Sequence, residues 1–370
     1  MPALLRNRSL AALMAAEFVS LGGSSMTFVA LPWFVLATTG STARMGWVLA
    51  AELVPVGVLG IPSGAVMLAI TFAIGCFLAP YYASSRLILP EIVGEDETLV
   101  AEGSAYVQAV NQLTQLAGPI LAGLLIASIS AATVLLIDAC TYLFSFVVIL
   151  TLVRAGRRAA PTEAARGIFA GVKFLARDRL LGPTLAAAAI LNFVAQGLVA
   201  TLPVLVFRRY GADAKVLGWF FAAFGGGELL GSMLASQLVR KVPLLRLTAV
   251  AILAMALPLW LLSIAMPWWL VFAVIAAFGF CAPLVNAPMI AVLTMRAPEA
   301  LRPKVMTAVM TISGIVGPLG FLAAGVGLQY VSLTFVFLFV AAGFTFGAIA
   351  FSAAVRNGDG QPHPAVPAPA

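Results

Sequence analysis

The chain has 370 residues, of which 62% are hydrophobic and only 9% are charged, and its mean hydropathy is +1.07. Soluble domains have about half apolar and about a quarter charged residues, so this composition excludes an ordinary water-soluble protein and indicates a membrane protein. The net charge of +7 does not indicate nucleic-acid binding, because the basic residues lie in short segments between apolar runs.

Apolar segments long enough to cross a bilayer, about 20 residues each, follow one another along almost the whole chain. The first apolar run continues beyond Glu17 to Thr38, which is too long for a cleaved signal peptide. We predict eleven spans, over residues 10–37, 43–61, 65–84, 105–128, 131–153, 184–207, 215–238, 246–264, 268–292, 304–328 and 332–355. The sequence therefore predicts an all-α, polytopic membrane protein.

A charged stretch over residues 154–182 separates the first five predicted spans from the last six. Within it, the segment GIFAGVKFLARDRLLG has apolar residues at helical spacing, which predicts an amphipathic helix on the membrane surface. Basic residues in alternate loops place this stretch in the cytoplasm. We expect an N-terminal bundle over 1–153, a cytoplasmic linker over 154–182, a six-helix bundle over 183–355 and a disordered, proline-rich tail over 356–370.

The two halves of the chain resemble each other. The segment NQLTQLAGPILAGLL (111–125) is similar to TISGIVGPLGFLAAGV (311–326), and each has a Gly-Pro pair in the middle of a predicted span. Two similar membrane halves are one of the known plans of secondary transporters. Glycine, proline and alanine are also common in membrane helices without any duplication, which is the alternative explanation.

Four segments carry a resemblance to a known family: ALPWFVLATTGSTARMGWVLAAELVP (30–55), APYYASSRLILPEIVGEDE (79–97), GPILAG (118–123) and GVKFLARDRLLG (171–182). With them the chain resembles the major facilitator superfamily, and within it the bacterial drug:proton antiporters related to macrolide efflux proteins. The resemblance implies two helical bundles with substrate bound between them. It also implies a conformational motif, made of Gly118, Pro119 and Gly123 with Gly317 and Pro318 in the second half.

The segment LGIPSGAVMLAITFAIGCF (59–77) departs from that family pattern, because two apolar segments meet in it without a charged loop. The family pattern has a loop of the form G-x-x-x-D-R-x-G-R-R after span two. Gly64 matches its first glycine, but Leu68 stands where the acidic residue is expected. By length, one span and its loop, on the order of 40 residues, are absent near Val66–Met67. We expect a shortened N-terminal bundle with an irregular connection over 61–67.

Charged side chains within spans are costly and usually face a cavity or a partner. The predicted spans contain four such carboxyl groups, those of Glu17, Glu52, Asp138 and Glu228. A carboxyl group shielded from water binds a proton more readily, as a proton-coupled carrier requires. These four are therefore the proton-coupling candidates; the alternative is a protonated carboxyl group that only hydrogen-bonds to a neighbouring helix.

Polar side chains also gather on single faces of several spans at about 100° per residue. The substrate-cavity candidates are Ser24, Gln108, Asn111, Gln115, Asn192, Gln196 and Asn286. Such faces indicate either a shared wet cavity or hydrogen bonds between helices.

The function predicted from the sequence is secondary active transport, as proton-coupled efflux of small lipophilic or amphipathic compounds by alternating access. The alternatives are a metabolite uptake carrier and a transport-incompetent, truncated membrane protein. No enzymatic activity, cofactor, metal site or nucleic-acid partner is expected; the proton gradient supplies the energy. We expect a monomer in the inner cell membrane. The sequence leaves open the substrate, the direction of transport and the orientation of the N-terminus.

Overall fold

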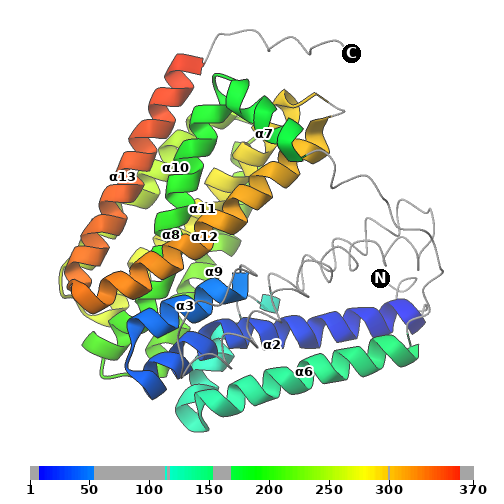
Figure 1. The fold of residues 1–370 in the computed structure, drawn as a ribbon, viewed down its shortest axis with the longest axis vertical. Coiled ribbons are helices and arrows are strands. Elements are labelled where there is room, and N and C mark those ends of the chain that lie inside the picture. Colours follow the sequence, from blue (N-terminus) through cyan, green and yellow to red (C-terminus); the bar gives the residue numbers. More distant parts are fainter. Residues whose placement is uncertain (1–7, 54–112, 115–116, 153–167, 299–300, 359–370) are drawn as a thin grey trace. The chain divides into compact units, whose positions relative to one another are not determined.

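The computed structural model describes residues 8–53, 113–114, 117–152, 168–298 and 301–358. All regular secondary structure in these residues is helical (Figure 1). The chain forms two compact units. Unit 1 comprises Met1–Ala159 and Leu202–Gly225, and unit 2 comprises Ala160–Thr201 and Gly226–Ala370.

Unit 1 is built around two long helices that lie side by side, α2 (Arg8–Thr39) and α6 (Ala131–Leu152) (Figure 1). The left-handed backbone of Gly40, with φ of +63°, ends α2 and lets the chain turn into the next helix. The unit also contains α3 (Thr42–Leu53), a short apolar helix (Ala117–Ser128), and the parts of α8 (Leu181–Arg209) and α9 (Ala214–Leu238) that fall within 202–225.

Unit 2 contains the remaining helices. They are α7 (Ile168–Arg177), the rest of α8 and α9, α10 (Leu244–Leu259), the 3₁₀ turn η2 (Trp260–Ser263), α11 (Trp268–Arg296), α12 (Arg302–Tyr330) and α13 (Leu333–Gly358). Helix α10 packs against both α11 and α13. Buried phenylalanines fill the interior; Phe278 of α11 meets Phe344 of α13 edge to face, with ring centroids 5.3 Å apart. This ring contact joins α11 to α13, and both helices pack on α10.

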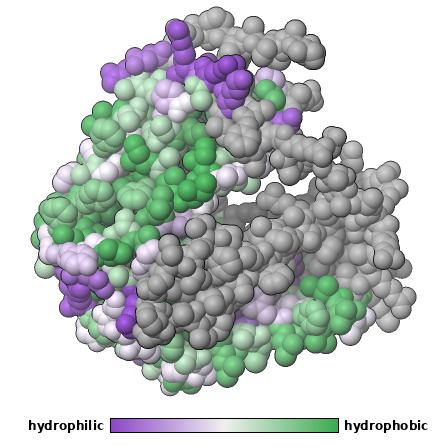
Figure 2. Space-filling view, viewed as in Figure 1, coloured by the Kyte–Doolittle hydropathy of each residue, from purple (hydrophilic) through white to green (hydrophobic). Residues whose placement is uncertain are grey.

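In the part of the chain that the structure describes, eight helices are long and apolar enough to cross a membrane. They correspond to the predicted spans at 10–37 and 131–153 and to all six over 184–355. Large apolar side chains on their outer faces, such as Leu136, Leu150 and Leu257, are exposed, as expected where lipid is the solvent. Figure 2 shows mostly hydrophobic residues along the visible face of α13.

The other three predicted spans extend beyond the described residues. Helix α3 is a part of the predicted span at 43–61, and the helix Ala117–Ser128 is a part of that at 105–128. The predicted span at 65–84 and the predicted irregular connection over 61–67 lie outside the described residues. At the other end, α13 continues through Arg356 to Gly358, three residues into the predicted tail. A cation in the last turn suits the partial negative charge of a helix C-terminus.

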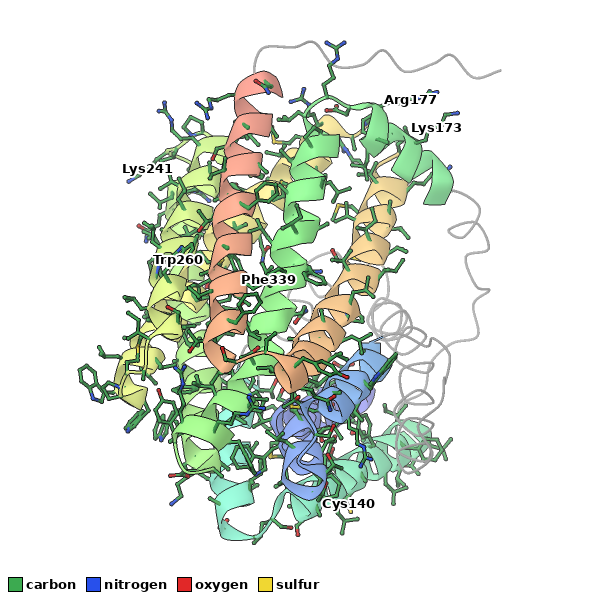
Figure 3. The ribbon with its side chains drawn as sticks, turned by 60° about the vertical axis from the view of Figure 1, so that its left-hand side comes forward. Cys140, Lys173, Arg177, Lys241, Trp260 and Phe339 are labelled. Carbon is green, nitrogen blue, oxygen red and sulfur yellow. The ribbon has the colours of Figure 1, made fainter. Side chains whose placement is uncertain are left out.

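The predicted helix in the linker is present as α7, and two of its apolar residues, Phe174 and Leu175, pack against protein. Leu175 is buried in a cluster with Leu293 of α11 and Val305 of α12. Lys173 and Arg177 are exposed on the opposite side (Figure 3). Leu175, one of the residues that suggested a helix on the membrane surface, therefore packs on α11 and α12.

Candidate functional site

Polar side chains of α2 and α6 meet in the interior of unit 1. The carboxylate of Asp138 is buried, and it accepts a hydrogen bond of 2.6 Å from Oγ1 of Thr27 and one of 3.1 Å from Oγ1 of Thr141. Gly23 makes this approach possible, because a Cβ atom there would overlap both Asp138 and Thr141.

Further hydrogen bonds join the same two helices. The hydroxyl groups of Ser24 and Tyr142 lie 2.8 Å apart. Oγ of Ser145 donates to the backbone carbonyl of Ala16, also over 2.8 Å. Glu17, next along α2, is half-buried. The structure thus brings the predicted site residues Ser24 and Asp138 to one helix contact, and their hydrogen bonds are those that hold membrane helices together.

A second set of predicted residues meets in unit 2, between α8 and α12. Nδ2 of Asn192 donates a hydrogen bond of 3.1 Å to the carbonyl of Ser313. Gln196, one turn further along α8, lies against Gly317: a Cβ atom on that glycine would be 3.4 Å from Cγ of Gln196. A Cβ atom on Gly320 would overlap the backbone of Phe193. The glycines of α12 therefore allow the polar pair of α8 to approach closely, beside Pro318.

The Gly-Pro segment of the first half also makes close helix contacts, all within unit 1. Gly118 lies against Ser25 of α2, where it leaves no space for a Cβ atom. On the same short helix, a Cβ atom on Gly123 would lie 2.8 Å from the carbonyl oxygen of Ala214 and 2.9 Å from Cα of Gly218 on α9. Gly123 and Gly218 thus form a backbone-to-backbone contact between two helices.

Glu228 lies in α9 beside a close helix contact. Gly227 and Gly231 allow α9 to touch α11 at Ala276 and Phe280, because a Cβ atom at either position would overlap the backbone of α11. Glu228 is half-buried, and among the described residues no basic or hydrogen-bonding side chain pairs with it. Asn286 of α11 is exposed and takes part in neither polar contact.

The side chains of the remaining predicted residues lie outside the described part of the chain. The backbone of Glu52 is in α3, but its side chain lies outside the described residues, as do Gln108, Asn111 and Gln115. Within the described ranges, no three His, Cys, Asp or Glu side chains gather as metal ligands would.

One ion pair of a buried aspartate with a half-buried arginine was not predicted from the sequence. Asp178 precedes α8, and its Oδ1 accepts the backbone N–H groups of Leu180 and Leu181 over 2.8 and 2.9 Å. Its Oδ2 lies 3.6 Å from Nε of Arg296, at the end of α11. An aspartate just before an apolar helical run is a signal for a helix N-terminus. No signal in the sequence points to Arg296 as its partner.

Comparisons with known proteins agree with this architecture. The model of the transmembrane secretion effector family matches residues 65–364. The chain is 27% identical over 365 residues to the multidrug efflux pump Tap of Mycolicibacterium fortuitum, covering 85% of this chain and 87% of the pump. It is 24% identical over 361 residues to the pump Tap of Mycobacterium tuberculosis, covering 85% of each. Among solved structures, a mutant of the nucleoside transporter NupG has a similar fold, with a TM-score of 0.76 at 11% identity, covering 93% of this chain and 99% of that one.

Proposed function

Because the chain belongs to the transmembrane secretion effector family of the major facilitator superfamily, we propose that it exports small lipophilic or amphipathic compounds by alternating access, coupled to inward movement of protons. The protein is a multi-pass membrane transporter and not an enzyme. We further propose the substrate class, the proton as coupling ion and the residues that bind substrate and proton. We also propose that the chain divides into two bundles, at 1–153 and 183–355.

The main support for export of varied compounds is the similarity to the multidrug efflux pump Tap over 85% of the chain. The polar side chains at the α8–α12 contact support a lipophilic substrate. Asn192 and Gln196 are uncharged, whereas a carrier of a charged metabolite needs a fixed opposite charge beside its substrate. A few neutral hydrogen-bonding groups among apolar walls suit lipophilic ligands.

Glu228 is our first candidate for the proton-binding group. It lies near the middle of a 25-residue helix that is long enough to span the bilayer. It is half-buried, and in the described part of the chain no partner satisfies its carboxylate. A carboxyl group within a membrane that has no fixed partner is suited to binding and releasing a proton.

Asp138 is a weaker candidate, because two hydroxyl groups already donate to its carboxylate. We propose that this residue mainly joins α2 to α6. Glu17 and Glu52 remain candidates for coupling on the basis of their place in predicted spans.

Proton flux in vesicles tests this assignment. The purified protein is reconstituted with a pH-sensitive dye inside, and proton entry is recorded after addition of a lipophilic dye substrate. We expect substrate-dependent proton flux in the wild type and none in Glu228→Gln. Asp213→Asn is the matched control, because Asp213 is an exposed acidic residue between α8 and α9, and it should behave as wild type.

Two results would contradict the proposal at different levels. Substrate movement without any proton flux in the wild type would exclude proton coupling. Normal flux in Glu228→Gln would exclude only the assignment of this residue, and Glu17→Gln would then be compared in the same assay.

A further inference from the structure

A cavity of about 830 Å³ opens at one end of unit 2, where α10 begins and where α11 and α13 end. Each of these helices contributes one arginine to its wall: Arg246, Arg296 and Arg356. Apolar side chains such as Leu245 and Met295 line the rest, and no lining residue in the described part of the chain is acidic. The cavity therefore combines concentrated positive charge with nonpolar walls.

The charge in this cavity is only partly neutralised by its surroundings. Nε of Arg296 faces Oδ2 of Asp178 at 3.6 Å, so this arginine is shared between the cavity and a buried carboxylate. Arg246 and Arg356 are exposed. Guanidinium groups bind phosphate oxygens with paired N–H donors, which makes a phosphate group a well-matched anion for this wall.

The cavity lies at the basic end of unit 2. Lys173, Arg177 and Lys241 are at this same end (Figure 3). Hydrophilic residues gather at the C-terminal end of α13, beyond the hydrophobic face of that helix (Figure 2). Membrane proteins keep such basic ends in the cytoplasm, so we expect the cavity at the depth of the lipid headgroups of the cytoplasmic leaflet.

An exposed apolar stripe continues from the cavity along α10. Val250, Leu253 and Leu257 are 59%, 41% and 68% exposed. They follow Arg246 by four, seven and eleven residues, so all four lie on one face of the helix. A free phosphate ion makes no use of such a stripe, whereas the acyl chain of a lipid packs along it.

From this arrangement we propose that the cavity is a binding site for an anionic phospholipid of the cytoplasmic leaflet. The phosphodiester group is bound by Arg246, Arg296 and Arg356, and an acyl chain lies on the stripe Val250, Leu253 and Leu257. Basic cavities between membrane helices on the cytoplasmic side bind anionic headgroups in this way. The site is separate from the polar contacts of α8 with α12.

Lipid binding to the delipidated, full-length protein tests this proposal. Binding is measured by native mass spectrometry, and thermal unfolding in detergent is followed with the same additions. The additions are phosphatidylglycerol, phosphatidylcholine and inorganic phosphate. We expect phosphatidylglycerol to bind the wild type most tightly and to raise its unfolding temperature, phosphatidylcholine to bind weakly, and inorganic phosphate not to displace the anionic lipid.

Charge-removing variants identify the site. Arg246→Gln and Arg356→Gln should each weaken phosphatidylglycerol binding about fivefold, and together about 25-fold, as expected for one basic residue near an anionic lipid surface. Lys173→Gln with Arg177→Gln is the matched control, because it removes two exposed charges from the same end outside the cavity. If the double variant does not fold, the loss of phosphatidylglycerol binding in the two single variants tests the site.

Three outcomes would overturn the proposal. Equal binding of phosphatidylglycerol and phosphatidylcholine would exclude recognition of anionic lipid. Displacement of the lipid by inorganic phosphate would show a site for free anions. An equal loss in the Lys173 and Arg177 control would show that only the overall charge matters.

Discussion

Oγ1 of Thr27 donates a hydrogen bond of 2.6 Å to Oδ2 of Asp138, and this bond joins α2 to α6 across 111 positions of the sequence. Both helices are membrane spans by length and composition. Lipid removes the hydrophobic drive for helices to associate, so hydrogen bonds and close packing of small residues hold spans together. In unit 1, a hydrogen bond and the close packing of a small residue occur at the same helix contact, because Gly23 lies directly beside Asp138.

Removing the carboxylate of Asp138 should loosen the contact of α2 with α6. We expect Asp138→Leu to lower the free energy of unfolding by about 1–2 kcal/mol, because the hydroxyl group of Thr27 loses its acceptor across the helix contact. The hydroxyl group of Thr141 keeps the backbone carbonyl of residue 138, at 2.8 Å, as an acceptor. Asp138→Asn keeps an acceptor oxygen and should cost less. The measurement is unfolding by titration with a denaturing detergent. Thr151→Val is the control, since this hydroxyl group bonds only to its own helix; equal stability of Asp138→Leu and wild type would contradict the structural role.

Gly22 and Gly23 provide a comparison between neighbouring positions. A Cβ atom on Gly23 would overlap Asp138 and Thr141, whereas one on Gly22 meets nothing within 4 Å. Gly23→Ala should therefore destabilise the protein by about 1–3 kcal/mol through overpacking. Gly22→Ala should be neutral or stabilising by up to about 1 kcal/mol, because alanine favours helix. Thermal unfolding in detergent measures both, and a larger loss for Gly22→Ala would contradict this packing.

The contact between Gly123 and Gly218 predicts strong coupling between two substitutions. Each single change to alanine should cost about 1–3 kcal/mol, because backbone atoms lie within 3 Å of the added methyl group. Their combined effect should differ from the sum by at least about 0.5 kcal/mol, as expected for residues in contact. A double-mutant cycle of unfolding free energies measures the coupling. Gly314→Ala, at a position with open space, is the control, and additive effects at Gly123 and Gly218 would speak against the contact.

Asp178 should be more important for stability than an exposed aspartate with a similar local role. Asp178→Ala removes acceptors for two backbone N–H groups and leaves Arg296 without its partner, so we expect a loss of about 2–3 kcal/mol. Asp213 is exposed and accepts one N–H group, that of Lys215, and Asp213→Ala should cost at most about 1 kcal/mol. Chemical unfolding of the two variants side by side tests the difference, and similar losses would show that the ion pair of Asp178 with Arg296 contributes little.

The sequence alone determined where most of the helices lie. The predicted span at 215–238 agrees with α9, which is Ala214–Leu238, and the one predicted at 268–292 lies within α11, Trp268–Arg296. This agreement has a physical cause. The thickness of the bilayer sets the length of a span, and the requirement to satisfy every backbone hydrogen bond within lipid makes it helical, so a local apolar window suffices.

The tertiary structure decided which partner each polar or small residue meets. The helical period places Asp138 and Thr141 on one face of α6, but it does not indicate that this face contacts Thr27. Nor does it distinguish Gly23, which leaves room for a neighbouring helix, from Gly22 beside it. The ion pair of Asp178 with Arg296 likewise follows from tertiary packing and not from the local sequence pattern. Local periodicity defines the faces of a helix, whereas the fit between surfaces from distant parts of the chain selects the face that each one contacts.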